Sequence, residues 1–143
     1  MIEEAKVIDY FDIQLLGEKS LPIYYKLNEL LDLRTFGYKI YKYTVNNSII
    51  GFVIFYINDK LKNIHIYSIA VDENVRNKGV GSQLIKSIKN KYDYSLTLNV
   101  SINNTNALKF YEKNNFIIIE EKENYYENLD IKNAYFMKYF NKI

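Results

Sequence analysis

A strand pattern, a glycine-containing loop and an amphipathic helix pattern follow one another between residues 63 and 92. Residues 63–71 (NIHIYSIAV) are rich in β-branched and aromatic side chains, which is typical of a strand. Residues 81–92 (GSQLIKSIKNKY) place Leu84, Ile85 and Ile88 on one helical stripe. The sequence therefore predicts a helix that packs its apolar stripe against a sheet.

Further patterns on both sides of this unit alternate between helix and strand. Helices are expected first, then three strands, a helix, a strand, a helix and two strands, which indicates an α/β or α+β fold around a mixed sheet. No linker or repeat interrupts the chain, so residues 1–143 are expected to form one domain. The expected helices are 11–20, 21–33, 81–92 and 104–116, and the expected strands are 38–45, 49–57, 63–71, 94–100, 116–123 and 133–140.

The composition argues against several classes of protein function. A net charge of +2 is too small to argue for nucleic-acid binding. The chain has no cysteine and one histidine, which leaves no thiolate nucleophile and no cluster for a metal site. The acidic start MIEEAKVIDYFD lacks the layout of a signal peptide, and the apolar run at 49–57 is too short to cross a bilayer. A cytoplasmic protein that binds neither nucleic acid nor membrane is expected.

The loop VRNKGVGSQL (75–84) could hold an anion. Its glycines fit neither the P-loop spacing G-x-x-x-x-G-K-[ST] nor the dinucleotide spacing G-x-G-x-x-G, because Leu84 stands where the latter needs its third glycine. What remains is R-x-x-G-x-G, formed by Arg76, Gly79 and Gly81, ahead of a helix. The first N–H groups of a helix and its dipole favour an anion, and glycines let it approach the backbone. The alternative is a tight turn whose cations are solvated.

The segment 63–116 resembles the GNAT (Gcn5-related) N-acetyltransferase superfamily. IYSIAVDENVRNKGVGSQLI is similar to that family's central strand, pyrophosphate loop and helix. NNTNALKFYEKNNF (103–116) is similar to its following helix, N-x-x-A-x-x-x-Y-x-x-x-G-F, with Asn104, Ala107 and Tyr111 at matching positions. Asn115 replaces the family's glycine, a mild departure because asparagine also adopts the left-handed helix cap.

The resemblance implies a single domain with a mixed, mostly antiparallel sheet of about six to seven strands flanked by about four helices. It also implies acetyl-CoA as the cosubstrate and direct acetyl transfer to a primary amine. The backbone of 69–71 would pair with the pantetheine arm, and the Val71 N–H would polarise the acetyl carbonyl where the family's strands splay at a bulge. The implied cofactor-binding residues are Ile69, Ala70, Val71, Arg76, Asn77, Lys78, Gly79, Val80, Gly81, Ser82, Asn104 and Tyr111.

Tyr111 corresponds to the tyrosine that protonates the departing CoA thiolate in the family. Without the resemblance it would be read as a core tyrosine. The general base is left open between His65, Tyr67 and water. His65 matches the position of a catalytic glutamate in histone-type members and Tyr67 that of a tyrosine in some N-terminal acetyltransferases, whereas Asn99, where ribosomal-protein enzymes carry an acid, cannot be a base. Strand alternation predicts that His65, Tyr67, Ile69 and Val71 share one face.

Two segments are similar to substrate loops of protein Nα-acetyltransferases of the ribosomal-protein alanine and archaeal/eukaryotic types. They are LPIYY, with Pro22 and Tyr25, and the C-terminal NYY…A..M pattern, with Tyr125 and Tyr126. The alternative is that these aromatics only pack. An acceptor at a protein N-terminus is therefore expected beside two alternatives, a small-molecule amine acetyltransferase (polyamine, aminoglycoside or amino acid) and a non-catalytic acyl-CoA-binding module. A homodimeric structural protein is a further possibility, and the oligomeric state is left as monomer or homodimer.

Overall fold

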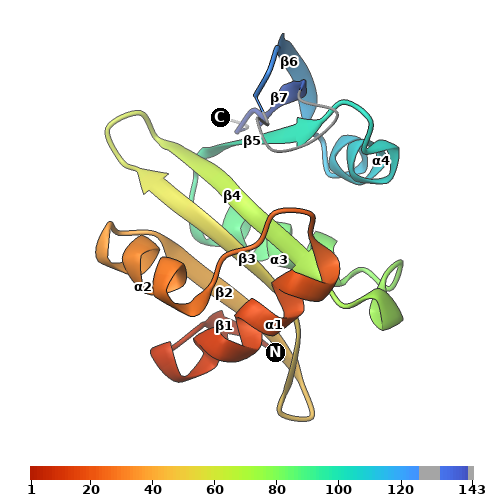
Figure 1. Cartoon of the computed structure of the whole chain (residues 1–143). Coiled ribbons are helices and arrows are strands. Elements are labelled where there is room, and N and C mark those ends of the chain that lie inside the picture. Colours follow the sequence, from red (N-terminus) through yellow and green to blue (C-terminus); the bar gives the residue numbers. More distant parts are fainter. Residues whose placement is uncertain (126–132, 142–143) are drawn as a thin grey trace. The chain divides into compact units, whose positions relative to one another are not determined.

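The structure, a computed structural model, describes residues 1–125 and 133–141. Its strands follow the order β1-β2-β3-β4-β5-β7-β6 in one mixed sheet, and four α-helices accompany them in the described part of the chain (Figure 1). The predicted α/β class is thereby confirmed. The strands are β1 Ile2–Glu4, β2 Lys39–Val45, β3 Ser48–Asn58, β4 Asn63–Val71, β5 Ser95–Ser101, β6 Ile117–Lys122 and β7 Ala134–Tyr139, and the α-helices are α1 Tyr10–Ser20, α2 Leu27–Thr35, α3 Val80–Lys91 and α4 Thr105–Lys113. Short 3-10 turns occupy Val7–Asp9 (η1) and Glu73–Val75 (η2).

The chain divides into two compact units. The first comprises Met1–Tyr56 and Ile66–Tyr92, and the second comprises Ile57–His65 and Asp93–Ile143. Strand β4 contributes its last six residues to the first unit and its first three to the second. The single domain expected over 1–143 stays a prediction, and each unit is described by itself below.

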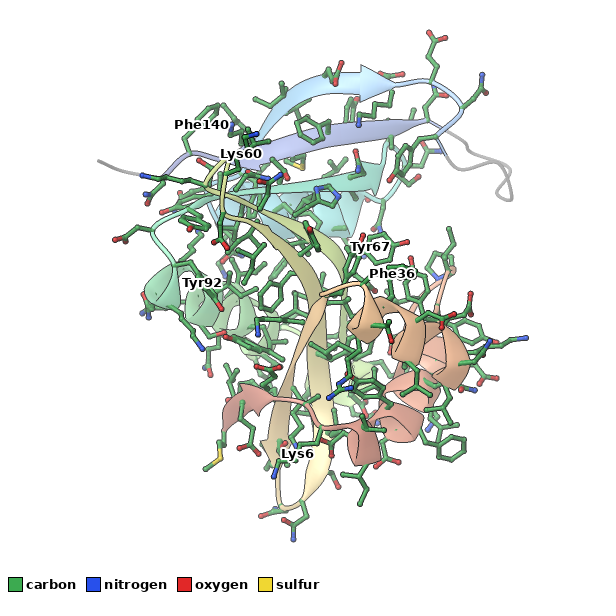
Figure 2. The ribbon with its side chains drawn as sticks, turned by 90° about the vertical axis from the view of Figure 1, so that its left-hand side faces the viewer. Lys6, Phe36, Lys60, Tyr67, Tyr92 and Phe140 are labelled. Atoms are coloured by element: carbon green, nitrogen blue, oxygen red, sulfur yellow. The ribbon has the colours of Figure 1, made fainter. Side chains whose placement is uncertain are left out.

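In the first unit, adjacent residues of β3 show which helices cover which face of the sheet. A Cβ at Gly51 would lie 3.0 Å from Val80 and 3.2 Å from Leu84, both in α3. Phe52 points to the other face, where its ring lies 3.6 Å from the Cβ position of Gly17 in α1. Figure 2 shows α1 and α2 on one side of these strands, with Tyr67 toward them, and α3 with Tyr92 on the other. Both faces of β3 are therefore covered, as its dense apolar run predicts.

In the second unit, antiparallel pairs of β5 and β7 assign residues to the two faces of the sheet. Leu96 is paired with Tyr139. The ring centroid of Tyr139 lies 6.2 Å from that of Phe116, which in turn lies 5.7 Å from that of Tyr111 in α4. The Leu96 face is therefore the one that α4 covers. Thr97 and Asn99 point to the opposite face, since successive strand residues alternate.

The N-terminal third contains one strand that was not expected and one helix whose expected start is wrong. Strand β1 was not expected, because three residues carry too little alternation to reveal a strand; it depends on pairing with β2, as in Ile2 with Tyr43. The helix expected over 21–33 begins only at Leu27. Leu21 is extended (ψ 143°), as a residue before proline tends to be, and the Lys26 N–H donates to Glu29 Oε1 at 3.0 Å, which closes the start of α2.

The apolar residues expected on one face of that helix differ in burial. Leu30 is buried at 1% exposure, whereas Ile23, Leu27 and Leu31 are 37–39% exposed. Residues 21–26 instead form an irregular connection between α1 and α2. This segment carries Pro22 and Tyr25, so the predicted substrate loop is indeed a loop.

Candidate functional site

The glycine loop turns through two left-handed residues before α3 begins. Asn77 has φ 65° and Gly79 has φ 82°, and Gly79 is the N-cap of the helix. A residue with a Cβ is strained at this φ, which accounts for the glycine. The first N–H groups of a helix have no carbonyl one turn before them, and such groups can bind an anion. The loop is therefore a tight turn that leads from β4 and η2 into α3.

Arg76 ties this loop to the end of β4. Its Nε donates a hydrogen bond to the backbone oxygen of Val71 at 3.2 Å. The loop is held from within as well, because Asp72 accepts a hydrogen bond from Asn74 N at 2.9 Å and caps η2. The guanidinium nitrogens of Arg76 that do not make this bond remain to face an anion, since arginine carries five donors. Lys78 adds a second cation to the loop.

Helix α3 begins close to the sheet. Val80 and Gly81 are buried, and Gln83 in the first turn accepts a hydrogen bond from the hydroxyl of Tyr43 at 2.8 Å. The closeness depends on Gly51, whose lack of a side chain leaves room for Val80. Ser82 lies in the same first turn. The first turn of α3 is therefore positioned by contacts with β2 and β3.

The alternation of side chains along β4 breaks before its last residues. Tyr67 stacks on Tyr25, on the α1–α2 side of the sheet. Ala70 is buried on that same side, in a cluster with Ile13 and Phe52. Residues three apart in a regular strand point to opposite faces, so β4 is irregular between Tyr67 and Ala70. His65, Tyr67, Ile69 and Val71 therefore do not share one face, and that expectation is wrong.

Strand β4 ends in a defined backbone arrangement. Asp72 N donates to Ile50 O of β3 at 2.9 Å, just after the three residues expected to pair with pantetheine, Ile69 to Val71. These three residues are the last three of β4, just before the glycine loop. An irregular strand leaves some backbone N–H and C=O groups outside the regular hydrogen-bond pattern of the sheet. An N–H group that polarises a carbonyl must be available in this way.

An aromatic cluster forms on the α1–α2 side of the first unit. The rings of Tyr25 and Tyr67 stack with centroids 5.2 Å apart, and Tyr38 contacts Tyr67 and Tyr56 at 5.1 Å each. Burial and the nearby phenols Tyr67 and Tyr56 raise the pKa of Tyr38 above its usual value. Tyr67 is 40% exposed and stays reachable from solvent. Sequence patterns alone did not identify Tyr38 or Tyr56 as partners of this cluster.

Helix α4 carries two predicted site residues of the second unit. The side chain of Asn104 accepts a hydrogen bond from Ala107 N at 3.2 Å and caps the helix. Tyr111 is 8% exposed, with its ring against Phe110 and Phe116. Asn115 has φ 69°, so the left-handed conformation predicted from the family's glycine is confirmed. Tyr111 is thus part of the core and can use only its hydroxyl for chemistry.

The opposite face of the second unit carries a polar group around β5. His65 Nδ1 lies 2.8 Å from Thr97 Oγ1, and Asn99 Nδ2 donates to the hydroxyl oxygen of Tyr125 at 3.1 Å. Burial and the charge of Lys122 lower the pKa of His65, so the imidazole is neutral near pH 7. The amine of Lys122 lies over the ring of Tyr125 at 5.7 Å. Thr97 was missed by sequence reasoning, since a threonine in a strand has no distinguishing pattern.

The predicted substrate residues are only partly described. Pro22 and Tyr25 lie in the α1–α2 loop, and Tyr125 lies just after β6. Tyr126 falls outside the described residues. Of these four substrate candidates, Tyr25 has a stacked ring partner in the first unit, and Tyr125 has a hydrogen-bond partner in the second unit.

Comparisons with known proteins show the family of the chain. The Acetyltransferase (GNAT) family matches residues 7–116, so the chain belongs to this family. An N-alpha-acetyltransferase from Saccharolobus solfataricus is 30% identical, over 95% of this chain and 90% of that protein. The structure of Ard1 from Thermoplasma volcanium is 31% identical, with a TM-score of 0.85 over 100% of this chain and 98% of that chain. The ribosomal-protein-S18-alanine N-acetyltransferase from Escherichia coli shares the fold at 20% identity, with a TM-score of 0.89 over 100% and 94% of the two chains.

The family membership confirms the predicted activity. The chain is an acetyl-CoA-dependent N-acetyltransferase that transfers an acetyl group to an amine. Within the same fold, Naa50 from Arabidopsis thaliana has been solved with the bisubstrate analogue CoA-Ac-MVNAL, at 23% identity and a TM-score of 0.80 over 96% of each chain. The described part of the chain contains no helix long and apolar enough to cross a membrane.

Proposed function

We propose that this enzyme acetylates the α-amino group of protein or peptide N-termini. The observation that carries the proposal is the irregular α1–α2 loop, which brings Tyr25 onto Tyr67 of β4. An extended peptide end can lie along such an aromatic wall, because tyrosine offers apolar area together with a polar hydroxyl. The N-alpha-acetyltransferases that match nearly the whole chain at about 30% identity support the same acceptor.

The cofactor side of the reaction is assigned to the glycine loop and α3. Residues 76–82 bind the pyrophosphate of acetyl-CoA through the N–H groups of the helix start and through Arg76 and Lys78. The backbone of 69–71 pairs with the pantetheine arm, which leaves the Val71 N–H to polarise the acetyl carbonyl. Asn104, whose side chain caps α4, contacts the cofactor.

The chemical step is direct transfer without a covalent enzyme intermediate, which suits a chain with no cysteine. The neutral amine attacks the thioester carbonyl, the new C–N bond forms as the C–S bond breaks, and the proton lost by the attacking nitrogen replaces the one that Tyr111 gives to the thiolate. Tyr111 protonates the departing thiolate through its hydroxyl. The proton from the ammonium form of the acceptor leaves through water, His65 or Tyr67.

The test is a matched pair of peptides. Acetyl-CoA turnover is measured with a peptide that has a free N-terminus and one internal lysine, and with the same peptide formylated at its N-terminus. Turnover of the first and not the second, with the acetyl group on residue 1 by mass spectrometry, is the expected result. Turnover only of polyamines, aminoglycosides or free amino acids would replace the proposal with a small-molecule acetyltransferase.

The small-molecule reading is the second candidate because it uses the same cofactor residues and differs only in the acceptor. A cytoplasmic location, a monomeric or homodimeric state and the absence of nucleic-acid or membrane partners remain predictions from the sequence. Size-exclusion chromatography with light scattering checks the oligomeric state.

A further inference from the structure

A buried threonine hydroxyl joins two side chains of β4 within the second unit. His65 and Thr97 are directly paired in the parallel register of β4 and β5. Thr97 Oγ1 lies 2.8 Å from His65 Nδ1 and accepts a hydrogen bond from Asn63 Nδ2 at 3.0 Å. Thr97 is 5% exposed, so these contacts are made away from water.

The hydroxyl of Thr97 has a single proton to donate. Asn63 uses the oxygen as an acceptor, and His65 Nδ1 is the remaining partner among the described residues. If Nδ1 carried a proton, Thr97 would accept two hydrogen bonds and its own O–H would be buried without an acceptor. Such an unpaired buried group costs about 1–3 kcal/mol. Donation from Thr97 to Nδ1 avoids this cost.

The orientation of the Asn63 amide supports the same direction. The Asn63 Oδ1 atom is buried and has no hydrogen-bond partner among the residues that the structure describes. The opposite orientation would put an NH₂ group with two donors in that place, which leaves more unpaired hydrogen-bonding capacity than one oxygen. Asn63 Nδ2 is therefore the group that faces Thr97.

The second ring nitrogen of His65 is in a different environment. His65 Nε2 makes no hydrogen bond to any described residue, and it is not among the buried unpaired atoms. A neutral imidazole carries one proton, so a ring that accepts at Nδ1 has its proton on Nε2. The solvent-accessible nitrogen is then a donor.

We propose that Thr97 is a positioning residue that holds neutral His65 with its proton on Nε2, so that the solvent-accessible nitrogen of His65 is a hydrogen-bond donor and not the lone pair of a general base. The proposal rests on the proposed function only in that His65 is one of the three candidate proton acceptors named there. It removes one of the three routes for the proton of the incoming amine and leaves water and Tyr67.

Nuclear magnetic resonance tests the tautomer directly, because His65 is the only histidine of the chain. Long-range proton–nitrogen correlation on the uniformly labelled protein, without substrate, is expected to show a protonated Nε2 and an unprotonated Nδ1 at a pH where the ring is neutral. A protonated Nδ1 in the neutral ring overturns the proposal. Because no acetyl transfer is involved, this outcome does not depend on which amine the enzyme uses.

Variants show whether Thr97 sets the tautomer. Thr97→Val keeps the shape and removes the hydroxyl, and it is expected to convert the single tautomer into a mixture, whereas Thr97→Ser is expected to retain it. Thr44→Val is the matched control, since Thr44 Oγ1 is a buried strand hydroxyl that has no partner in the described part of the chain. An unchanged tautomer in folded Thr97→Val contradicts the role of Thr97. If that variant does not fold, the wild-type spectrum still decides which nitrogen is protonated.

Activity separates a donor from a base. The Nε2 amide of glutamine can donate where the imidazole Nε2–H does, but it cannot accept a proton. His65→Gln is therefore expected to retain kcat within about tenfold, while His65→Ala loses more. A loss of about 10²–10⁴-fold in both variants, the range for removal of a general base, overturns the proposal. Acetylation of a small amine in place of a peptide overturns the proposed acceptor and leaves this comparison intact.

Discussion

The ring of Tyr25 lies nearly parallel to the ring of Tyr67, with centroids 5.2 Å apart and planes inclined by 20°. One tyrosine belongs to the irregular loop after α1 and the other to β4. The stack holds a segment without regular secondary structure against a strand. It therefore gives the loop that we propose for the acceptor a defined position in the absence of substrate.

Loss of this stack is expected to weaken binding of the acceptor. An aromatic pair contributes about 0.5–1.5 kcal/mol, so Tyr25→Ala should raise KM for the peptide by up to about tenfold. Tyr25→Phe keeps the ring and serves as the control, with KM near wild type. Steady-state kinetics at saturating acetyl-CoA measures the effect. An unchanged peptide KM in Tyr25→Ala would show that the loop does not form the acceptor site.

Arg76 is expected to contribute to CoA affinity both by its charge and by its bond to Val71 O. Hydrogen bonds to charged groups are worth about 1.5–3 kcal/mol, so Arg76→Ala should weaken CoA binding by about tenfold or more. Arg34→Ala, at the end of α2, is the control and should bind CoA normally. Isothermal titration calorimetry with CoA makes the comparison. Equal affinity in the two variants would exclude Arg76 from the pyrophosphate site.

Tyr111 is expected to act in catalysis and not in binding. Tyr111→Phe keeps the ring against Phe116 and removes the hydroxyl, so kcat should fall by about 10²–10⁴-fold, the usual contribution of a general acid. The Kd for CoA should stay the same. Tyr139→Phe, a second tyrosine packed on Phe116, should keep normal kcat. Intact turnover in Tyr111→Phe would assign proton donation to another group.

Gly51 is expected to be required for the approach of α3 to the sheet. A Cβ there would lie 3.0 Å from Val80 Cγ1 and 3.3 Å from the backbone oxygen of Ala70. Gly51→Ala should lower the free energy of unfolding by about 1–3 kcal/mol, the usual cost of overpacking, and should weaken CoA binding because the start of α3 shifts. Urea denaturation and calorimetry measure the two effects.

Gly17→Ala is the contrasting variant for this prediction. Its added Cβ would lie 3.3 Å from Tyr24 Cβ, and alanine in a helix gains about 1 kcal/mol over glycine. The two effects oppose each other, so stability should change little. If Gly51→Ala were as stable as Gly17→Ala and bound CoA normally, the closeness of α3 and β3 would have no functional consequence.

The Asp9–Lys42 ion pair is expected to make stability depend on pH. Burial of the Asp9 carboxyl raises its pKa, but the Lys6 N–H and the Lys42 ammonium lower it by more. The pKa of Asp9 therefore lies below its usual value. The pair, at 2.9 Å, therefore stabilises the fold above the unfolded-state pKa of Asp9 and loses this contribution as pH falls through the folded-state pKa.

Lys42→Met tests the pair, and it also removes the longer and more exposed contact of Lys42 with Glu3 at 3.7 Å. It should cost about 1–2 kcal/mol of unfolding free energy at pH 7, and the difference from wild type should shrink in acid. Lys39→Met removes a more exposed pair with Glu4 and should cost about 0–1 kcal/mol. Urea denaturation across pH 2–7 compares them. A difference for Lys42→Met that stays constant down to pH 2 would contradict the assignment to Asp9.

Much of the fold could be predicted because its signals are local. The strand over 63–71 and the helix after the glycine loop are where the pattern of apolar residues places them. Asn115 adopts the left-handed conformation that its place at a helix end indicates. Strand β1 and the late start of α2 could not be predicted, because one depends on pairing with a distant strand and the other on Pro22 and a cap at Lys26.

By itself, the sequence determined the cofactor motif. R-x-x-G-x-G and the Asn104–Tyr111 spacing are short-range features, since the backbone conformation of a loop and the start of a helix depend on residues close in the chain. The tertiary structure decided the surroundings of the residues that we propose for the acceptor and for proton transfer. The stacking of Tyr25 on Tyr67, the break in the alternation of β4 and the bond from Thr97 to His65 all depend on partners or packing contacts far apart in the chain. Such contacts form only when the chain folds, because no local preference of the backbone specifies them.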